Sequence, residues 1–135
     1  MTDQGEAVPR VPAGLDSTLG AEYLEMTAER VMIRVEVGPH LKQPFGIVHG
    51  GVYCSLVESS ASMGAAAWYA DRGIVVGMSN QTDFLRPVRE GAITATATPV
   101  HRGRTTQLWE VQIRDGADQL VARGQVRIAN LQPRD

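Results

Sequence analysis

The sequence contains a single cysteine, Cys54, among its 135 residues. One thiol cannot form an internal disulfide, and a chain without internal disulfides suits a reducing compartment. No run of Lys and Arg stands out and the net charge is −2, whereas a non-specific nucleic-acid binder normally carries a basic face. No apolar run approaches the length of a membrane span. These absences disfavour a disulfide-stabilised scaffold, nucleic-acid partners and membrane partners.

The composition is that of one folded domain. Hydrophobic residues make up 43% of the chain and charged residues 21%, values that are ordinary for a globular protein. The chain length suits one domain with a sizeable core. The first 13 residues are polar and contain proline, without the basic-then-apolar order of a secretory signal. We therefore expect a leader over residues 1–13, a single domain over residues 14–130, a tail over residues 131–135 and a cytoplasmic location.

The domain is predicted to begin with a hairpin. Valine and isoleucine alternate with other residues from Val31 to Val37, the pattern of a half-buried strand. A strand over residues 21–27 is expected to pair with it, preceded by a short helical turn over residues 15–19. Gly38 and Pro39 end the second strand.

The segment over residues 51–70 is the one long helix that the sequence predicts. Small or apolar residues cover almost its whole circumference at helical spacing. A helix of that kind is buried on most sides. A polar stop and a glycine follow at Asp71, Arg72 and Gly73.

Four strands are predicted after this helix, over residues 74–85, 92–100, 108–114 and 120–129. Turn-forming residues connect the later ones, including Asp115-Gly116. Consecutive strands with short turns favour an antiparallel sheet, and a lone apolar helix needs a sheet wrapped around it. The predicted fold class is therefore α+β, with a curved antiparallel sheet around one long central helix.

One carboxylate, Glu58, interrupts the predicted helix. A buried carboxylate costs several kcal/mol in lost solvation unless something compensates it. A structural interpretation is an ion pair with an arginine, or exposure at a gap in the surrounding sheet. A functional interpretation is a general base or a nucleophile. Ser62 lies one turn later and can hydrogen-bond along the same face.

His49, Gly50 and Gly51 immediately precede the helix. The first N–H groups of a helix have no internal partner and lie at the positive end of its dipole. Structurally, the glycines form a flexible turn and His49 is a cap or a packing residue. Functionally, these amides can bind the oxygen of a carbonyl under attack, as an oxyanion hole does. The residues alone leave an enzyme and a scaffold equally open.

The segment QPFGIVHGG, from Gln43 to Gly51, followed by LVES from Leu56 to Ser59, resembles the hotdog-fold acyl-CoA thioesterases of the PaaI / 4-hydroxybenzoyl-CoA thioesterase superfamily. The similarity covers residues 15–128, and the family's fold is a helix wrapped by an antiparallel sheet. A glutamate here, with Ser or Thr one turn later, resembles the Arthrobacter-type 4-hydroxybenzoyl-CoA thioesterases. It also resembles the 1,4-dihydroxy-2-naphthoyl-CoA thioesterases of menaquinone synthesis.

The resemblance implies an acyl-CoA hydrolase that needs no cofactor, coenzyme A being part of the substrate. Its acyl group is expected to be aromatic, with a medium-chain fatty acyl group as the alternative. The resemblance also implies active sites shared between subunits. Because one sheet around one helix leaves an exposed flank, we expect self-association as a homodimer or homotetramer.

The family's functional residues carry over to five positions. Glu58 would attack the thioester carbonyl or activate the water that does, and the Gly50 amide would polarise the carbonyl oxygen. Gln43 would position the carbonyl or the water. His49 would orient the loop or the sulfur side, and Ser62 would support Glu58 or the acyl group.

The turn formed by Arg102, Gly103, Arg104 and Thr105 is a candidate site for the coenzyme A phosphates. Two guanidinium groups and local backbone N–H groups suit such an anion. A solvated basic turn is the alternative interpretation, and the resemblance favours the nucleotide. Further candidates for substrate binding are Gly51, Ser79, Asn80 and Arg86. No metal site is predicted, because no histidine has metal-ligand spacing to another histidine or a carboxylate.

Two other functions remain open for this fold. Hydration or dehydration of an acyl thioester pairs an acid with a proton-moving histidine. His49 is the candidate for that role, and its position in the loop ranks this function lower. A non-catalytic acyl-CoA-binding protein is the second alternative.

Overall fold

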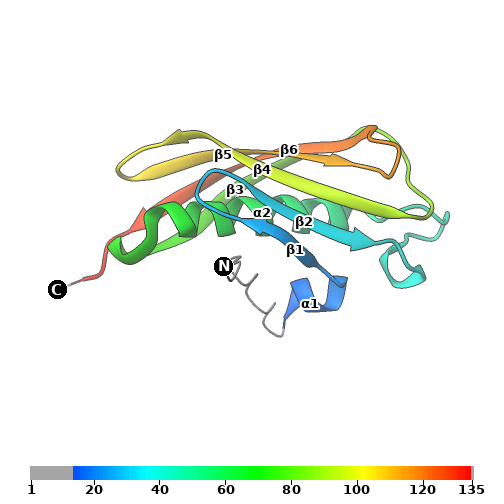
Figure 1. Ribbon diagram of the computed structural model, residues 1–135, viewed down its shortest axis with the longest axis horizontal. Coiled ribbons are helices and arrows are strands. Elements are labelled where there is room, and N and C mark those ends of the chain that lie inside the picture. Colours follow the sequence, from blue (N-terminus) through cyan, green and yellow to red (C-terminus); the bar gives the residue numbers. More distant parts are fainter. Residues whose placement is uncertain (1–13, 135) are drawn as a thin grey trace, which may run out of the picture.

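The computed structural model describes residues 14–134, so the leader predicted over residues 1–13 lies outside the described residues. Over the described residues the chain forms a six-stranded sheet curved around one long helix (Figure 1). Its elements are α1 (Leu15–Leu19), β1 (Glu22–Met26), β2 (Val31–Glu36), η1 (Pro39–Leu41), α2 (Gly50–Tyr69), η2 (Ala70–Arg72), β3 (Ile74–Phe84), β4 (Ala92–Arg102), β5 (Thr106–Arg114) and β6 (Leu120–Leu131). The predicted α+β fold is confirmed, and the last strand runs two residues further than expected.

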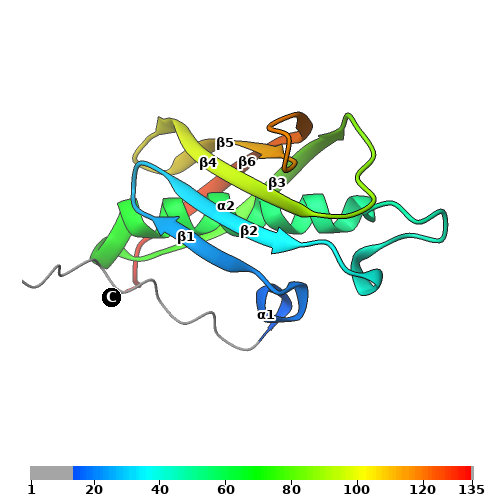
Figure 2. The ribbon, with the colours of Figure 1, turned by 45° about the vertical axis from the view of Figure 1, so that its right-hand side comes forward.

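The strands lie in the order β1-β2-β4-β5-β6-β3, and every neighbouring pair is antiparallel. β3 follows α2 in the chain but occupies the edge of the sheet beside β6. The helix α2 spans the concave side of the sheet, where it contacts β2 to β6 (Figure 2). In the described part of the chain no helix, α2 included, has the length and hydropathy that a membrane span requires.

One stripe of α2 forms the centre of the core. Its buried residues recur at the three- and four-residue spacing of a helix face and pack beneath the inward side chains of the strands. They are Val52, Tyr53, Leu56, Val57, Ser60, Ala61, Gly64, Ala65 and Tyr69. The opposite stripe, which includes Cys54, Glu58, Ser62 and Ala66, stays partly or fully exposed in the single chain. The expectation of burial on most sides is therefore wrong for one chain, because its sheet covers only one side of the helix.

A buried polar cluster ties β5 and β6 to the turn after β4. Trp109 Nε1 donates to Gln107 Oε1 at 2.8 Å, and Gln107 Nε2 donates to Asn130 Oδ1 at 2.8 Å. Asn130 Nδ2 in turn donates to the Gly103 carbonyl at 3.0 Å. The side chains of this cluster thus satisfy one another and the Gly103 carbonyl, which is the condition under which such a network stabilises a core.

At Gly64, α2 packs tightly against a side chain of the sheet. A Cβ at this position would lie 2.6 Å from the ring of Trp109, which is fully buried. We expect Gly64→Ala to lower the free energy of unfolding by about 1–3 kcal/mol through overpacking, although alanine is the better helix former by about 1 kcal/mol. Urea unfolding measures the change.

The matched background for this test is Trp109→Phe, which shortens the ring that the added methyl group would meet. The cost of Gly64→Ala should shrink in that background, because the clash is relieved. An equal cost in both backgrounds, or a gain in stability from Gly64→Ala alone, would contradict the proposed contact.

Candidate active site

In the first turn of α2, the backbone amide of Gly50 is open, that is, without a hydrogen-bond partner in the described structure. His49 is the N-cap, and its Nδ1 accepts the Gly51 N–H at 2.8 Å. The His49 carbonyl accepts the Val52 N–H at 2.9 Å. The Gly50 N–H has no hydrogen-bond partner among residues 14–134. The cap role foreseen for His49 is confirmed, and Gly50 rather than Gly51 presents a free donor at the positive end of the helix.

The loop before the helix is closed by its own hydrogen bonds. The Gln43 N–H donates to the Ile47 carbonyl at 2.9 Å, and the Gly46 N–H donates to the Gln43 carbonyl at 3.0 Å. Gly46 has a φ of 83°, a conformation that glycine adopts without strain. The Gln43 side-chain oxygen accepts the Phe45 N–H. This leaves the Gln43 side-chain NH₂ group as the donor available beside the helix start.

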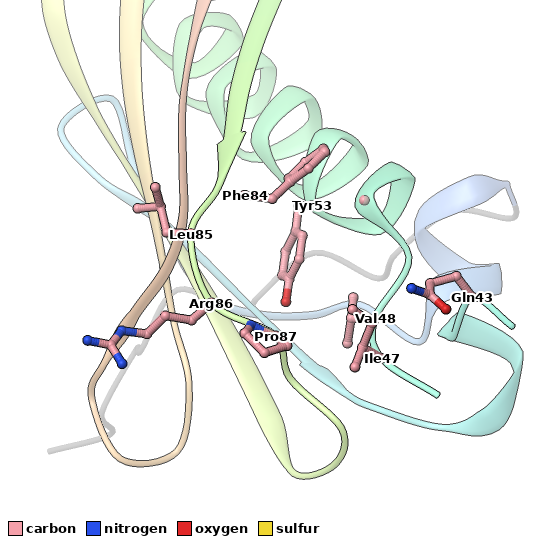
Figure 3. Close-up of a pocket in the computed structure, with 9 residues that line it drawn as sticks. Gln43, Ile47, Val48, Tyr53, Phe84, Leu85, Arg86 and Pro87 are labelled. Carbon is pink, nitrogen blue, oxygen red and sulfur yellow. The ribbon is translucent and has the colours of Figure 1, made fainter. Parts of the chain in front are cut away.

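A pocket of about 480 Å³ opens at this loop and at the open amide. Most of its lining is apolar or aromatic (Figure 3). The lining residues are Gln43, Ile47, Val48, Gly50, Tyr53, Phe84, Leu85, Arg86 and Pro87. The Tyr53 and Phe84 rings pack together with their centroids 5.9 Å apart. Gln43, Gly50 and Arg86 were expected here from the sequence, whereas the two aromatic residues were missed. The only sign of Tyr53 and Phe84 in the sequence was that each lies two or three residues from a position already chosen as a candidate, Gly50 or Arg86.

Glu58 lies two turns further along α2, held by an uncharged partner. Asn80 Nδ2 donates to Glu58 Oε2 at 3.3 Å and to the Cys54 carbonyl at 3.0 Å. Asn80 Oδ1 accepts the Thr82 hydroxyl at 2.7 Å. The carboxylate packs against Gly77, where there is no room for a Cβ.

Within the described residues, no arginine, lysine or histidine forms an ion pair with Glu58. The ion-pair interpretation is therefore excluded there. The side chain is partly exposed at the flank of the helix that the sheet leaves open.

Gly50 and Glu58 are too far apart to act on one carbonyl within a single chain. Eight residues separate them, which is about 12 Å along a helix axis. Gly50 lines the pocket and Glu58 does not. Reacting atoms must approach to about 3–3.5 Å. A single chain therefore cannot bring the Gly50 amide and the Glu58 carboxylate to the same carbonyl group.

Two other predicted residues lie near Glu58 without bonding to it. Ser62 is one turn further on and partly buried, and no hydrogen bond joins it to Glu58 in the described structure. The support expected from Ser62 comes instead from Asn80, which reaches Glu58 from β3. Ser79, the neighbour of Asn80, is exposed on the same strand.

The predicted phosphate clamp does not form as a pair of arginines. Arg102 Nη1 donates to the Ala28 carbonyl at 2.9 Å and lies 3.2 Å from Glu29 Oε1. Its guanidinium also lies 5.5 Å from the Trp68 ring centroid. Glu29 therefore neutralises Arg102, and Arg104 is the exposed arginine of the turn.

The backbone of this turn is fixed by hydrogen bonds. The Gly103 N–H donates to the Thr106 carbonyl, and the Thr105 carbonyl accepts the Asn130 N–H, both at 2.9 Å. Because Arg102 contacts Trp68, the turn lies by the C-terminal end of α2, opposite the helix start. Residues 14–134 contain no cluster of His, Cys, Asp or Glu that could hold a metal ion.

Comparison with solved structures gives close matches to this fold. The Mycobacterium tuberculosis protein Rv1847, named provisionally as an esterase, is 47% identical over 127 residues, covering 92% of this chain and 91% of its own. Its structure superposes with a TM-score of 0.86 at 49% identity, covering 89% of this chain and 98% of its own. A 1,4-dihydroxy-2-naphthoyl-CoA hydrolase of Listeria monocytogenes is 36% identical over 116 residues, covering 86% of this chain and 94% of its own.

A third relative is SAV0944 of Staphylococcus aureus, which one of its structures describes as a thioesterase. It is 28% identical, with a TM-score of 0.85 over 89% of this chain and all of its own. Its solved variants replace a glutamate and a glutamine with alanine, and the spacing of these two residues equals that of Glu58 and Gln43.

The sequence model of the Thioesterase superfamily matches residues 45–122, which include Gly50, Glu58 and all of β3. The sheet wrapped around α2 is the hotdog architecture that the resemblance implied. This chain belongs to the thioesterase superfamily.

Proposed function

We propose that this thioester hydrolase cleaves an aromatic acyl-CoA in active sites that two copies of the chain build together. Glu58 of one copy is the nucleophile or general base, and the Gly50 amide of the other copy binds the carbonyl oxygen. The observation that carries the proposal is the pairing of an open amide at an apolar pocket with an uncompensated carboxylate on the same helix. Their separation of about 12 Å requires a second chain.

The chemistry follows from these two groups. A carbonyl oxygen on the Gly50 N–H lies at the positive end of α2, which stabilises the negative charge that develops as the carbonyl is attacked. Glu58 either attacks the carbonyl carbon itself, forming an anhydride that water then hydrolyses, or takes a proton from the attacking water. On either path the carbon–sulfur bond breaks and coenzyme A leaves as a thiolate that takes up a proton. The donor group of Gln43 serves to position the carbonyl or the water.

An aromatic acyl group suits the lining of the pocket. Tyr53 and Phe84 form one wall of it, and Val48, Leu85 and Pro87 supply apolar surface. Planar rings stack or pack edge-to-face on such side chains. The name of the Listeria relative, a naphthoyl-CoA hydrolase, gives independent support.

The open edge of β3 supports self-association. The other edge strand, β1, is short, carries Glu22 and Glu25 and has a register shift, all of which discourage pairing with another chain. β3 has 11 residues, and its Val76 and Met78 side chains are 46% and 50% exposed. A long edge strand with exposed apolar side chains is a ready template for a second strand. The second strand is best supplied by β3 of another copy.

Asn80 supports a specific arrangement of the two copies. It bonds to the carbonyl of Cys54, which lies midway between Gly50 and Glu58 on α2. A two-fold axis near Asn80 pairs the two β3 strands antiparallel and sets the two α2 helices antiparallel. Each Glu58 then faces the partner's Gly50. The same rotation carries the exposed Arg104 turn from the far end of α2 towards the partner's helix start, where it can bind the coenzyme A phosphates.

Neither alternative function gains support from the site. A hydratase needs a histidine that is free to move protons, and His49 uses Nδ1 to accept the Gly51 N–H. A purely binding protein has no use for a carboxylate that lacks a cationic partner. Release of free thiol from an acyl-CoA separates hydrolysis from both alternatives.

Replacing Glu58 tests the chemical step. Glu58→Gln keeps the side-chain length and an oxygen for the Asn80 amide, but it removes the charge. We expect kcat for aryl-CoA hydrolysis to fall by about 10²- to 10⁴-fold, with KM changed much less. Release of free thiol measures both constants. The control is Glu36→Gln, on an exposed residue of β2. Wild-type turnover by Glu58→Gln would remove Glu58 from the mechanism.

Mixing two defective chains tests whether the site is shared. Glu58→Gln and Gln43→Ala should each be slow alone. In a mixed dimer, one site carries both defects and the other carries neither. Random reassociation of equal amounts should therefore restore about a quarter of wild-type activity. Wild-type protein taken through the same unfolding and refolding is the reference. A mixture no more active than its parents would show that each site comes from one chain.

A further inference from the structure

The edge strand β3 runs alongside α2 and reaches Glu58. Gly77, near the start of the strand, packs against Glu58, whereas Phe84, at its end, packs against Gly50. The strand therefore runs antiparallel to the helix. Between these two contacts, the Asn80 side chain bonds to Glu58 and to the helix backbone.

A register shift allows β3 to turn both Gly77 and Asn80 towards the helix. Side chains alternate between the two faces of a strand, so residues three apart ordinarily point to opposite faces. Here Gly77 and Ser79, which are two residues apart, pair with consecutive residues of β6. Met78 is therefore the extra residue of a β-bulge. Bulges re-aim side chains and are over-represented next to active sites.

Gly77 leaves the space in which the Glu58 carboxylate lies. A Cβ at position 77 would overlap Glu58 Oε1, so any other residue there would displace the carboxylate. Asn80 Nδ2 donates to the second oxygen, Oε2, at 3.3 Å. Oε1 has no hydrogen bond with residues 14–134. The strand thus holds one oxygen of the carboxylate and leaves the other without a partner.

The orientation of the Asn80 amide follows from its neighbours. The Cys54 carbonyl and the ionised Glu58 carboxylate can only accept hydrogen bonds, so the amide nitrogen must face them. The amide oxygen then faces Thr82, whose hydroxyl donates to it at 2.7 Å. Thr82 is confined in turn, because its Oγ1 would lie 2.8 Å from a Cβ at Gly124 of β6. Thr82 therefore fixes the amide that orients the carboxylate.

We propose that Asn80 and Thr82 are positioning residues for thioester hydrolysis, which hold Glu58 Oε2 and leave Oε1 to react. The inference rests on the proposed function, because Glu58 is taken as the group that attacks the carbonyl or activates the water. No hydrogen bond joins Thr82 to Glu58 in the described structure, so Thr82 acts through Asn80. Precise orientation matters, because misplacing a reacting group by about 1 Å can slow a reaction about 10²-fold.

Gly77→Ala tests the space for the carboxylate. Gly77 has no positive φ, so alanine causes no backbone strain there. The added methyl group meets only the end of a flexible side chain, so thermal unfolding should change little. We expect kcat for aryl-CoA hydrolysis to fall by about ten- to a hundredfold, with KM changed much less. Gly116→Ala is the matched control, because a Cβ there meets no non-neighbouring atom within 4 Å.

Thr82→Val tests the hydrogen bond behind the amide. Valine keeps the shape of the side chain and removes the hydroxyl, so kcat should fall by about three- to tenfold with KM unchanged. Thr82→Ser, which keeps the hydroxyl, should recover most of the lost rate. Thr98→Val, on an exposed residue of β4, is the control for the substitution itself. Equal values of kcat for Thr82→Val and Thr82→Ser would overturn the role of Thr82.

A double-mutant cycle shows whether Thr82 acts through the carboxylate. In the Glu58→Gln background, Thr82→Val should cause no further loss of the residual kcat, and free-thiol release measures this rate. The same fold loss in both backgrounds would overturn the inference. A slow Glu58→Gln variant beside fully active Gly77→Ala and Thr82→Val variants would overturn the positioning role alone. Wild-type turnover by Glu58→Gln would overturn the proposed function, and the inference with it.

Discussion

The rigidity of α2 holds Gly50 and Glu58 at a fixed separation of about 12 Å. The curved sheet buries one stripe of this helix and keeps the opposite stripe open, so the helix cannot bend to bring the two groups together. The Gly50 amide without a hydrogen-bond partner and the Glu58 carboxylate therefore cannot reach the same carbonyl within one chain. In the assembly we propose, a second copy related by a two-fold axis supplies both counterparts at once, since the same separation recurs in reverse on the partner helix.

Asn80 connects this constraint to the sheet. From the edge strand β3 it bonds both to Glu58 and to the helix backbone at Cys54. The strand that would meet the partner therefore also orients the carboxylate. Glu58 has no cationic partner among the described residues, and β3 leaves a long edge with exposed apolar side chains uncovered. Features that do not serve stability concentrate at functional sites. Here the carboxylate of Glu58 and the uncovered edge of β3 lie on the same side of the molecule.

Much of the fold could be predicted because it depends on local patterns. Alternation located the strands, and the small-residue run located α2 with Glu58 inside it. The burial of that helix was overestimated, because composition does not reveal on which side a sheet lies. Contacts between distant segments were also missed. Arg102 is paired with Glu29, which precedes it by more than seventy residues, and Asn80 rather than nearby Ser62 supports Glu58. The pocket joins Tyr53 to Phe84 across the fold, a proximity that no spacing in the sequence encodes.

The central claim is that one thioester is held between Gly50 of one chain and Glu58 of another. A crystal structure of the assembled protein with an unreactive ketone analogue of an aryl-CoA tests it most directly. We predict the ketone oxygen within hydrogen-bond distance of the Gly50 nitrogen of one chain, with the Glu58 carboxylate of the partner chain facing the carbonyl carbon. A ketone that contacts Gly50 while no Glu58, from either chain, lies near its carbon would contradict the account.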